Sequence, residues 1–201
     1  MNYIDTLNYI HSLGNFSKPP TLDRIKAVLE KLSNPQNNFK AIHIAGTNGK
    51  GSVSAMLHTV FKEVGYKTGL YISPFIIDFC ERIQINGEFV PKDMLCQLAE
   101  KVIETEIELT EFEFITAMAF LYFESQKCDI AVIETGLGGR LDATNSLTNL
   151  VANVITKIGL DHTAILGDTV RQITKEKCGI IKKCPVITTP YQPSDALEIL
   201  H

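Results

Sequence analysis

The sequence predicts an α/β domain with a mostly parallel sheet, helices on both faces and a phosphate-binding loop. Short apolar runs of strand length alternate along the chain with longer segments of helical periodicity. The runs are continuously apolar, as in strands that helices cover on both sides. A glycine-rich turn at residues 46–52 joins the first run to a helical segment, as in phosphate-binding α/β proteins.

Length and composition restrict the class of protein. The chain has 201 residues, of which 45% are hydrophobic and 21% charged, and this composition excludes a disordered chain. Its apolar runs are shorter than the roughly 20 residues that span a bilayer, and residues 1–5 lack the pattern of a secretory signal. The net charge of −4 argues against a general affinity for nucleic acid. We therefore expect neither a membrane nor a nucleic acid as a partner.

The cysteines indicate a reducing compartment. Their number is odd, and none has the C-x-x-C spacing of a zinc or redox site. We expect unpaired thiols in a cytoplasmic protein. The five are Cys80, Cys96, Cys128, Cys178 and Cys184.

Four elements are predicted in the first 72 residues. Leu22, Ile25 and Leu29 belong to an apolar stripe at helical spacing that ends before Pro35. Gly65 follows a second amphipathic segment and is the expected C-terminal cap. The predicted elements are a helix over 22–32, a strand over 41–45, a helix over 52–64 and a strand over 68–72.

The alternation continues to residue 189. Asn86 and Gly87 favour the tight turn of a hairpin, and Pro91 is tolerated in the first turn of a helix. Ligands of such sheets bind at the carboxyl ends of the strands, where three polar motifs lie. The predicted elements are a hairpin over 83–90, helices over 91–107 and 112–126, strands over 130–134 and 151–156, a helix over 170–181 and a strand over 186–189.

The first polar motif is Gly-Thr-Asn-Gly-Lys-Gly-Ser at residues 46–52. Glycines let the backbone wrap around an anion, a helix N-terminus offers unpaired N–H groups, and Lys50 adds a positive charge. The spacing departs from the usual phosphate loop because Gly51 stands between the lysine and the serine. A plain glycine-rich turn is the alternative, but the strand before and the helix after favour phosphate binding.

The other two motifs follow later strands. Glu134 ends a buried strand, where an unpaired carboxylate is costly, so we expect it to meet a cation or a hydrogen-bond donor. Asp142 and Asn145 are, from the residues alone, turn formers. His162 lies beyond the next strand and is either a structural residue or, with Glu134, a ligand of magnesium shared with nucleotide phosphates.

Taken in order, these motifs resemble the folylpolyglutamate synthase family, which includes the bifunctional dihydrofolate synthases and is related to the Mur peptidoglycan ligases. The resemblance runs from Leu22 onward. It implies a Mur ligase central-domain fold and a ligase that uses ATP to add glutamate to a folate carboxylate through an acyl phosphate. Six segments in register carry it: residues 46–52, 73–74, 81–83, 136–145, 161–163 and 176–180.

The resemblance also implies two cofactors, ATP and Mg²⁺, and the residues that hold them. Lys50 matches the lysine that faces the β- and γ-phosphates, and Lys177 matches a carbamylated lysine that helps to place a second magnesium. The implied catalytic residues are Lys50, Lys177 and His162. The implied nucleotide ligands are Asn48, Gly49, Lys50, Gly51 and Ser52, and the implied magnesium ligands are Ser73, Glu134 and His162.

The implied partners are small molecules, namely ATP, a reduced folate and L-glutamate. Two residues depart from the family pattern. Phe75 stands where histidine is usual, so a polar role there is lost or moved, and Cys178 stands where alanine is usual. The implied folate-binding positions are Thr21, Leu22, Asp23, Arg82, Thr110, Glu111, Phe112, Glu113, Leu141, Asp142 and Ala143.

Members of this family are considerably longer than this chain. We therefore expect residues 1–201 to be an incomplete N-terminal ATP-binding domain, without the C-terminal ligase domain and inactive alone. Two alternatives belong to other classes: a truncated nucleotide-binding module without ligase activity, and a hydrolytic switch ATPase. ADP release that depends on folate and glutamate distinguishes the ligase from the module.

Overall fold

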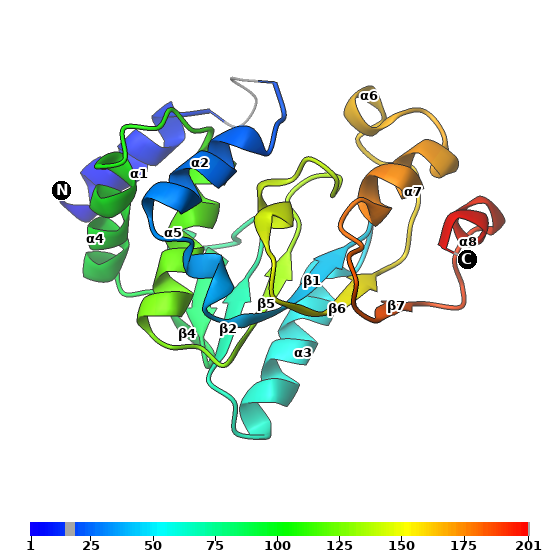
Figure 1. Ribbon diagram of the computed structural model, residues 1–201, viewed down its shortest axis with the longest axis horizontal. Coiled ribbons are helices and arrows are strands. Elements are labelled where there is room, and N and C mark those ends of the chain that lie inside the picture. Colours follow the sequence, from blue (N-terminus) through cyan, green and yellow to red (C-terminus); the bar gives the residue numbers. More distant parts are fainter. Residues whose placement is uncertain (15–18, 201) are drawn as a thin grey trace.

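The computed structural model describes residues 1–14 and 19–200, which form one seven-stranded sheet with helices on both faces (Figure 1). The strand order is β4-β3-β2-β5-β1-β6-β7. Strands β2, β5, β1, β6 and β7 run parallel, and the β3–β4 hairpin adds two antiparallel strands at one edge. The strands are β1 Lys40–Ala45, β2 Thr68–Tyr71, β3 Ile83–Ile85, β4 Glu88–Phe89, β5 Ile130–Glu134, β6 Leu150–Ile155 and β7 Val186–Thr188.

The helices divide unequally between the two faces of the sheet (Figure 1). Helix α3 packs on one face, and helices α1, α2, α4, α5 and α7 lie on the side of the other. The helices are α1 Tyr3–Ser12, α2 Asp23–Lys31, α3 Lys50–Glu63, α4 Lys92–Ile103, α5 Glu111–Ser125, α6 Thr163–Leu166, α7 Val170–Cys178 and α8 Ser194–Leu200. No helix in the described ranges is long and apolar enough to cross a membrane.

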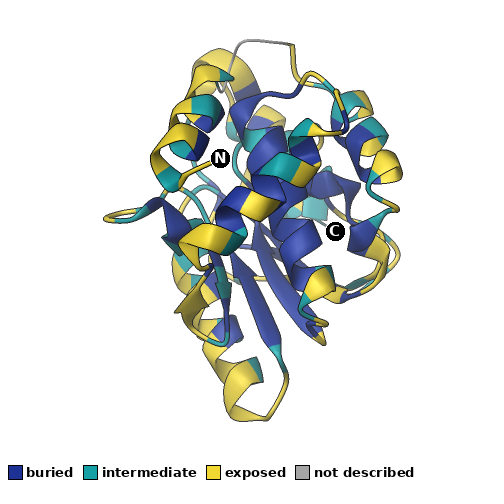
Figure 2. Cartoon of the chain, turned by 90° about the vertical axis from the view of Figure 1, so that its left-hand side faces the viewer, coloured by how far each residue is buried: buried dark blue, intermediate teal, exposed yellow. Residues whose placement is uncertain are grey.

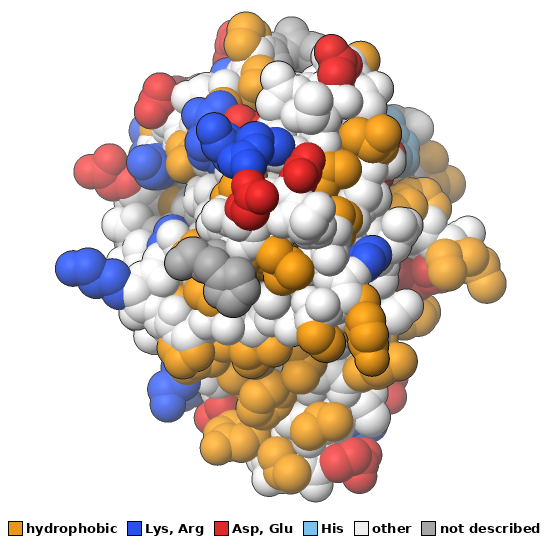
Figure 3. Space-filling view, turned by 90° about the vertical axis from the view of Figure 1, so that its right-hand side faces the viewer, with side chains coloured by type: hydrophobic (Ala, Val, Ile, Leu, Met, Phe, Trp, Pro, Cys, Tyr) orange, Lys and Arg blue, Asp and Glu red, His pale blue; other side chains and the backbone are white. Residues whose placement is uncertain are grey.

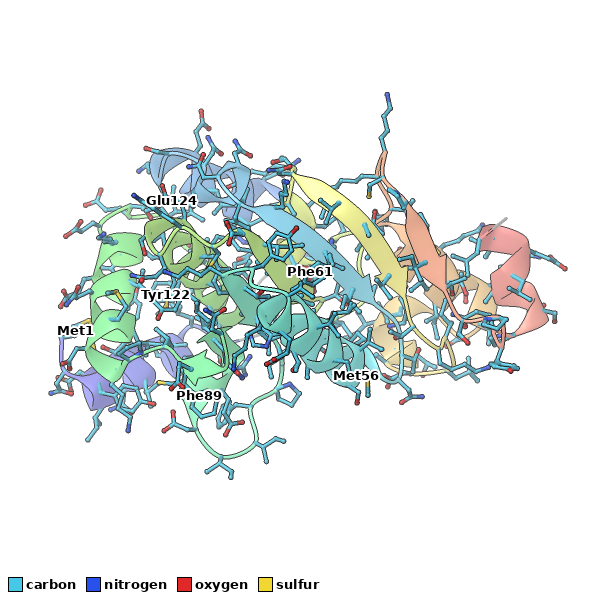
Figure 4. The ribbon with its side chains drawn as sticks, turned by 90° about the horizontal axis from the view of Figure 1, so that it is seen from below. Met1, Met56, Phe61, Phe89, Tyr122 and Glu124 are labelled. Carbon is cyan, nitrogen blue, oxygen red and sulfur yellow. The ribbon has the colours of Figure 1, made fainter. Side chains whose placement is uncertain are left out.

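The packing of α3 follows from alternation along the strands. Ile42 and Ile44 point to one side of β1 and pack, with side chains of β2, β5 and β6, against the inner face of α3. Figure 4 shows Phe61 of α3 toward the strands and Met56 on the outer side of the helix. Met56 is exposed, whereas Phe61 packs against this cluster.

The opposite face is covered mainly by α5. Nearly every residue of α5 is buried, because it lies between the sheet and helices α1, α2 and α4 (Figure 2). A helix that is apolar all round is expected in such a position. Alternate residues of β1, namely Ala41, His43 and Ala45, are buried on this side of the strand.

Several large apolar side chains remain exposed on α3 and on β7, which lies at an edge of the described sheet. Figure 3 shows hydrophobic side chains gathered on the lower part of the face that it presents. An exposed apolar surface beside an edge strand favours association. The exposed residues include Met56, Val60, Val64, Val186 and Ile187.

The predicted fold class is confirmed, and the differences lie at element ends. The helix predicted over 91–107 ends at Ile103, because the Thr105 hydroxyl donates to the Val102 carbonyl and Glu106 takes a left-handed φ of 58°. The helix predicted to reach residue 181 ends at Cys178. Helices α1, α6 and α8 were not predicted. The signal for α1 is Asn2, whose side chain accepts from the Asp5 N–H as an N-cap.

Candidate functional site

The glycine-rich turn lies where predicted, between β1 and α3. Gly49 has a left-handed φ of 84° and precedes α3 without a side-chain cap, so the first N–H groups of the helix are directed to the turn. The N–H groups of Thr47 and Asn48 both donate to the Lys157 carbonyl, at 2.9 and 3.2 Å. The turn is thus fixed to the segment that follows β6.

Lys50, the first residue of α3, faces the buried carboxylate of Glu134. Its Nζ lies 3.8 Å from Glu134 Oε1, and Glu134, at the end of β5, is 4% exposed. The Ser73 N–H donates to Glu134 Oε2 at 3.3 Å. Burial raises the pKa of Glu134, and the positive charge of Lys50 counteracts this increase. The sequence predicted a cation or a hydrogen-bond donor for Glu134, and the fold supplies one of each.

Lys177 approaches the same turn from α7. Lys177 is 3% exposed, and its Nζ donates to the Gly46 carbonyl at 2.8 Å. Burial, together with the nearby charge of Lys50, lowers the pKa of Lys177 to about 8. Two lysines therefore converge on the turn. The ammonium group of Lys177 loses its proton more readily than that of an ordinary lysine.

His162 is not joined to this cluster by any contact of the described residues. It precedes α6 with a φ of 48°, its side chain is 54% exposed, and its Nε2 lies 3.7 Å from Asp161 Oδ2. Within the described ranges, no group of three or more His, Cys, Asp or Glu side chains is close enough to hold a metal ion. The assignment of Ser73, Glu134 and His162 to magnesium stays a prediction.

The predicted folate segment at Thr110–Glu113 begins α5. The Glu113 carboxylate accepts from the Thr110 N–H at 2.8 Å, and the Thr110 hydroxyl accepts from the Glu113 N–H at 3.4 Å, which is a capping box. Arg24 of α2 binds both Glu113 oxygens through Nε, at 3.1 and 3.0 Å. Glu113 is therefore occupied by structural partners, whereas Glu111 contacts His11 at 3.5 Å.

Replacing Arg24 should weaken the start of α5. In Arg24→Ala the buried Glu113 carboxylate loses its cation, and we expect the free energy of unfolding to fall by about 3 kcal/mol. Arg171→Ala is the control, because its pair with Glu198 is exposed and should contribute less than about 1 kcal/mol. Urea denaturation measures both variants. Equal losses would contradict a special role for the Arg24 pair.

The predicted segment at Leu141–Ala143 belongs to a loop that Asp142 organises. Asp142 Oδ2 accepts from the Leu137 N–H at 2.8 Å, and Oδ1 accepts from the Thr144 N–H at 3.0 Å. The ring of Phe112 packs against Gly136, where a Cβ atom would lie 2.5 Å from the ring. The predicted segment at the start of α5 therefore contacts the residue that precedes this loop.

Arg82 and the segment at Thr21–Asp23 are placed differently. The Arg82 guanidinium lies 5.3 Å from the centre of the Phe75 ring and 5.5 Å from that of Phe79, and these contacts are cation–π interactions. The Thr21 hydroxyl donates to Asp23 Oδ2 at 2.9 Å, a local bond at the start of α2. Neither observation tests folate binding.

Sequence reasoning missed two residues that support the site. Arg24 is one, and no local pattern marks it, because its partner is 89 positions away. His43 is the other, and its signal is visible, because it is a lone imidazole within the apolar run of β1.

The loop, Lys50 and the buried Glu134 at the strand ends define an α/β domain of the phosphate-loop class. Sequence comparison gives the family. Residues 44–190 match the Mur ligase middle domain, and the chain belongs to that family. The predicted family resemblance is confirmed.

Curated relatives match the chain over almost its whole length. It is 43% identical over 209 residues to the dihydrofolate synthase/folylpolyglutamate synthase of Bacillus subtilis, covering 99% of this chain and 48% of that protein. It is 42% identical to the folylpolyglutamate synthase of Lacticaseibacillus casei, covering 99% and 49%. The chain thus spans about half the length of these relatives.

Solved structures share both the fold and a substantial part of the sequence of this chain. An FPGS–AMPPCP–folate complex superposes with a TM-score of 0.95 and 41% identity, covering 100% of this chain and 51% of that one. E. coli FolC in complex with DHPP and ADP gives a TM-score of 0.91 and 32% identity, covering 99% and 49%. These similar proteins are complexes with an ATP analogue or ADP and with folate or DHPP.

Proposed function

We propose that this chain is the nucleotide-binding part of a ligase that uses ATP to join glutamate to a folate carboxylate. The observation that carries the proposal is the convergence of Lys50, Glu134 and Lys177 on one glycine-rich turn. The similar FPGS and FolC complexes, which contain nucleotides and folate or DHPP, support it. All five cysteines are free, which supports a cytoplasmic location.

ATP is the proposed ligand of the turn. The first N–H groups of α3 and the Lys50 ammonium would hold the β- and γ-phosphates, since Lys50 is the first residue of α3 and its Nζ donates to the Thr47 carbonyl of the turn at 3.4 Å. Residues 48–52 are the proposed nucleotide ligands. Lys50 would neutralise charge that develops on the phosphates during transfer.

Ser73 and Glu134 fit the oxygen preference of magnesium. Glu134 is buried, and Lys50 lies 3.8 Å from it, which is beyond hydrogen-bond distance, so the carboxylate can accept further ligands. His162 is the proposed third ligand, although imidazole is an unusual partner for this hard cation. When bound, magnesium would orient the phosphate oxygens and withdraw their charge.

The proposed reaction has two steps. A folate carboxylate oxygen bonds to the γ-phosphorus while the bond to the bridging oxygen of ADP breaks. The glutamate amine then attacks the acyl carbon, phosphate leaves with the former carboxylate oxygen, and the nitrogen releases a proton as the amide forms. The chain would contribute mainly by positioning, with Phe112 and Asp142 on the folate side and Lys50 on the phosphate side.

Removing the Lys50 ammonium should weaken ATP binding. We expect Lys50→Ala to raise the Kd for ATP about 10- to 150-fold, since a hydrogen bond to a charged group contributes about 1.5–3 kcal/mol. Lys62→Ala, in the last turn of the same helix, is the matched control and should leave the Kd unchanged. Isothermal titration calorimetry measures both variants, and equal affinities would remove the phosphate-loop assignment.

The ligase activity needs a separate test. The protein is incubated with ATP, Mg²⁺, a reduced folate and L-glutamate, and the folate is analysed by mass spectrometry. A product heavier by one glutamate residue supports the ligase proposal for this chain. Binding of ATP and folate without a product assigns to it the nucleotide-binding module alone.

A further inference from the structure

A fully buried histidine lies on the strand that leads into the phosphate loop. His43 of β1 is 0% exposed, and its Nε2 lies 2.7 Å from the Thr144 hydroxyl oxygen. Thr144 follows the loop that carries the proposed folate segment at residues 141–143. Polar groups buried this deeply need a hydrogen-bond partner, and Thr144 is the partner that His43 has.

The direction of the hydrogen bonds can be assigned. Asp142 accepts backbone N–H groups on both oxygens, from Leu137 and from Thr144. Burial raises the pKa of Asp142, and these hydrogen bonds counteract the increase, so we assign the carboxylate form. The Thr144 hydroxyl is 2.5 Å from Asp142 Oδ1 and must donate its single hydrogen there. It can then only accept from His43, so the Nε2 of His43 carries the proton.

The other imidazole nitrogen supports this assignment. Nδ1 of His43 is buried and has no hydrogen-bond partner, and an unprotonated nitrogen is the less costly occupant of such a place. Burial, together with the charge of Lys182, lowers the pKa of His43 to about 3. The side chain is therefore a neutral donor over the whole physiological range.

The chain of hydrogen bonds joins two parts of the site. At one end is β1, whose next residues form the phosphate loop. At the other is Asp142, which fixes the backbone at Leu137 and Thr144 and so holds the loop between them. The Thr144 hydroxyl is the link between the two ends, because Thr144 Oγ1 contacts both Asp142 and His43.

We propose that His43 is a positioning residue that, through the Thr144 hydroxyl, holds Asp142 and the loop at 141–143 in the conformation that binds the pteroate part of the substrate. This inference rests on the proposed function, because that function assigns folate to the loop. The competing interpretation is that His43 only fills space in the core. The two interpretations predict different folate affinities for a replacement of His43 that retains a hydrogen-bond donor.

The test compares four variants with the wild type. His43→Leu removes the donor and His43→Gln retains an N–H near the position of Nε2. Thr144→Val removes the hydroxyl, and the fourth variant combines His43→Leu with Thr144→Val. Calorimetry with ATP and, separately, with a reduced folate in the presence of ATP gives two affinities for each protein.

We expect His43→Leu to weaken folate binding about tenfold, which is the scale of one lost hydrogen bond to a neutral partner, and to change the Kd for ATP less than about twofold. His43→Gln should recover most of the folate affinity. Thr144→Val should lose as much as His43→Leu, and the double variant should lose no more than either. Unchanged folate affinity, additive losses or an equal loss of both ligands would overturn the proposal.

A second measurement does not depend on folate. The ¹⁵N spectrum of the wild-type imidazoles should show His43 protonated on Nε2 and not titrating above pH 4. The opposite tautomer would refute the chain of hydrogen bonds even if folate binds. Wild-type protein that binds ATP but no folate, with the expected tautomer, would contradict the proposed function and with it the role of His43 in that function.

Discussion

Gly46→Ala should destabilise the domain by about 3 kcal/mol, at the upper end of the usual cost of overpacking a core. A Cβ atom at this position would lie 1.8 Å from the Thr156 hydroxyl oxygen and 3.2 Å from the Thr156 carbonyl carbon. The second contact is with backbone, which cannot rotate away. The Gly46 carbonyl also accepts from Lys177, so any displacement should reach the site and abolish ATP binding.

Two other glycines are the controls for this substitution. Gly159→Ala places its Cβ in open space with no left-handed φ, so we expect a change within about 0.5 kcal/mol. Gly49→Ala also meets open space but keeps a φ of 84°, which should cost about 1–2 kcal/mol. Urea denaturation measures the loss of stability for each of the three variants and so gives their order. A loss for Gly159→Ala equal to that for Gly46→Ala would refute the steric argument.

The sequence predicted the sheet well because the strands are continuously apolar. The run at residues 130–134 is fully buried between two neighbours, as its composition requires. The loop at 46–52 was equally readable, since glycines and a lysine between a strand and a helix have few other uses. Helix α1 was missed because its apolar residues are few and its cap, Asn2, is a single residue.

The site was less predictable because its contacts join distant segments. Lys177 meets Gly46 across 131 positions, and Thr144 meets His43 across 101. No local pattern carries information on such pairs, which arise only when the strands pack in the order β5-β1-β6. The family resemblance supplied Lys177, whereas Arg24 emerged only from the contacts of the fold. The lone His43 is visible in the apolar run of β1, but its partner Thr144 is not.

Phe75 illustrates a departure whose physical effect the structure explains. The sequence indicated that a polar role at this position is lost or moved. In the fold, the Phe75 ring lies 5.3 Å from the Arg82 guanidinium, which also faces Phe79. An aromatic ring attracts a guanidinium through its π face, so Phe75 contacts a cation without a polar atom.

Lys177 should be far more reactive toward carbon dioxide than an ordinary lysine. With a pKa of about 8, roughly half of its amines are neutral at pH 8, against less than about 1% for an unperturbed lysine. Because the folded state holds this proton less tightly than the unfolded state, Lys177 contributes an increase in stability as pH rises from about 8 to its usual 10.5. Below pH 8 Lys177 is protonated, and burial of its charge lowers the stability of the folded state by the full amount.

Carbamylation would remove that penalty by another route. The neutral nitrogen bonds to the carbon of CO₂ and releases a proton, and the resulting anion lies near Lys50, whose charge disfavours the ammonium form of Lys177. We therefore expect protein equilibrated with ¹³C-bicarbonate at pH 8 to show a carbamate carbon by NMR. Lys177→Arg should abolish the signal, because a guanidinium keeps its proton. Lys175→Arg, an exposed neighbour on the same helix, should keep it. A signal that survives Lys177→Arg would refute the modification at this residue, and no signal in the wild type would show that the neutral amine alone is not sufficient for it.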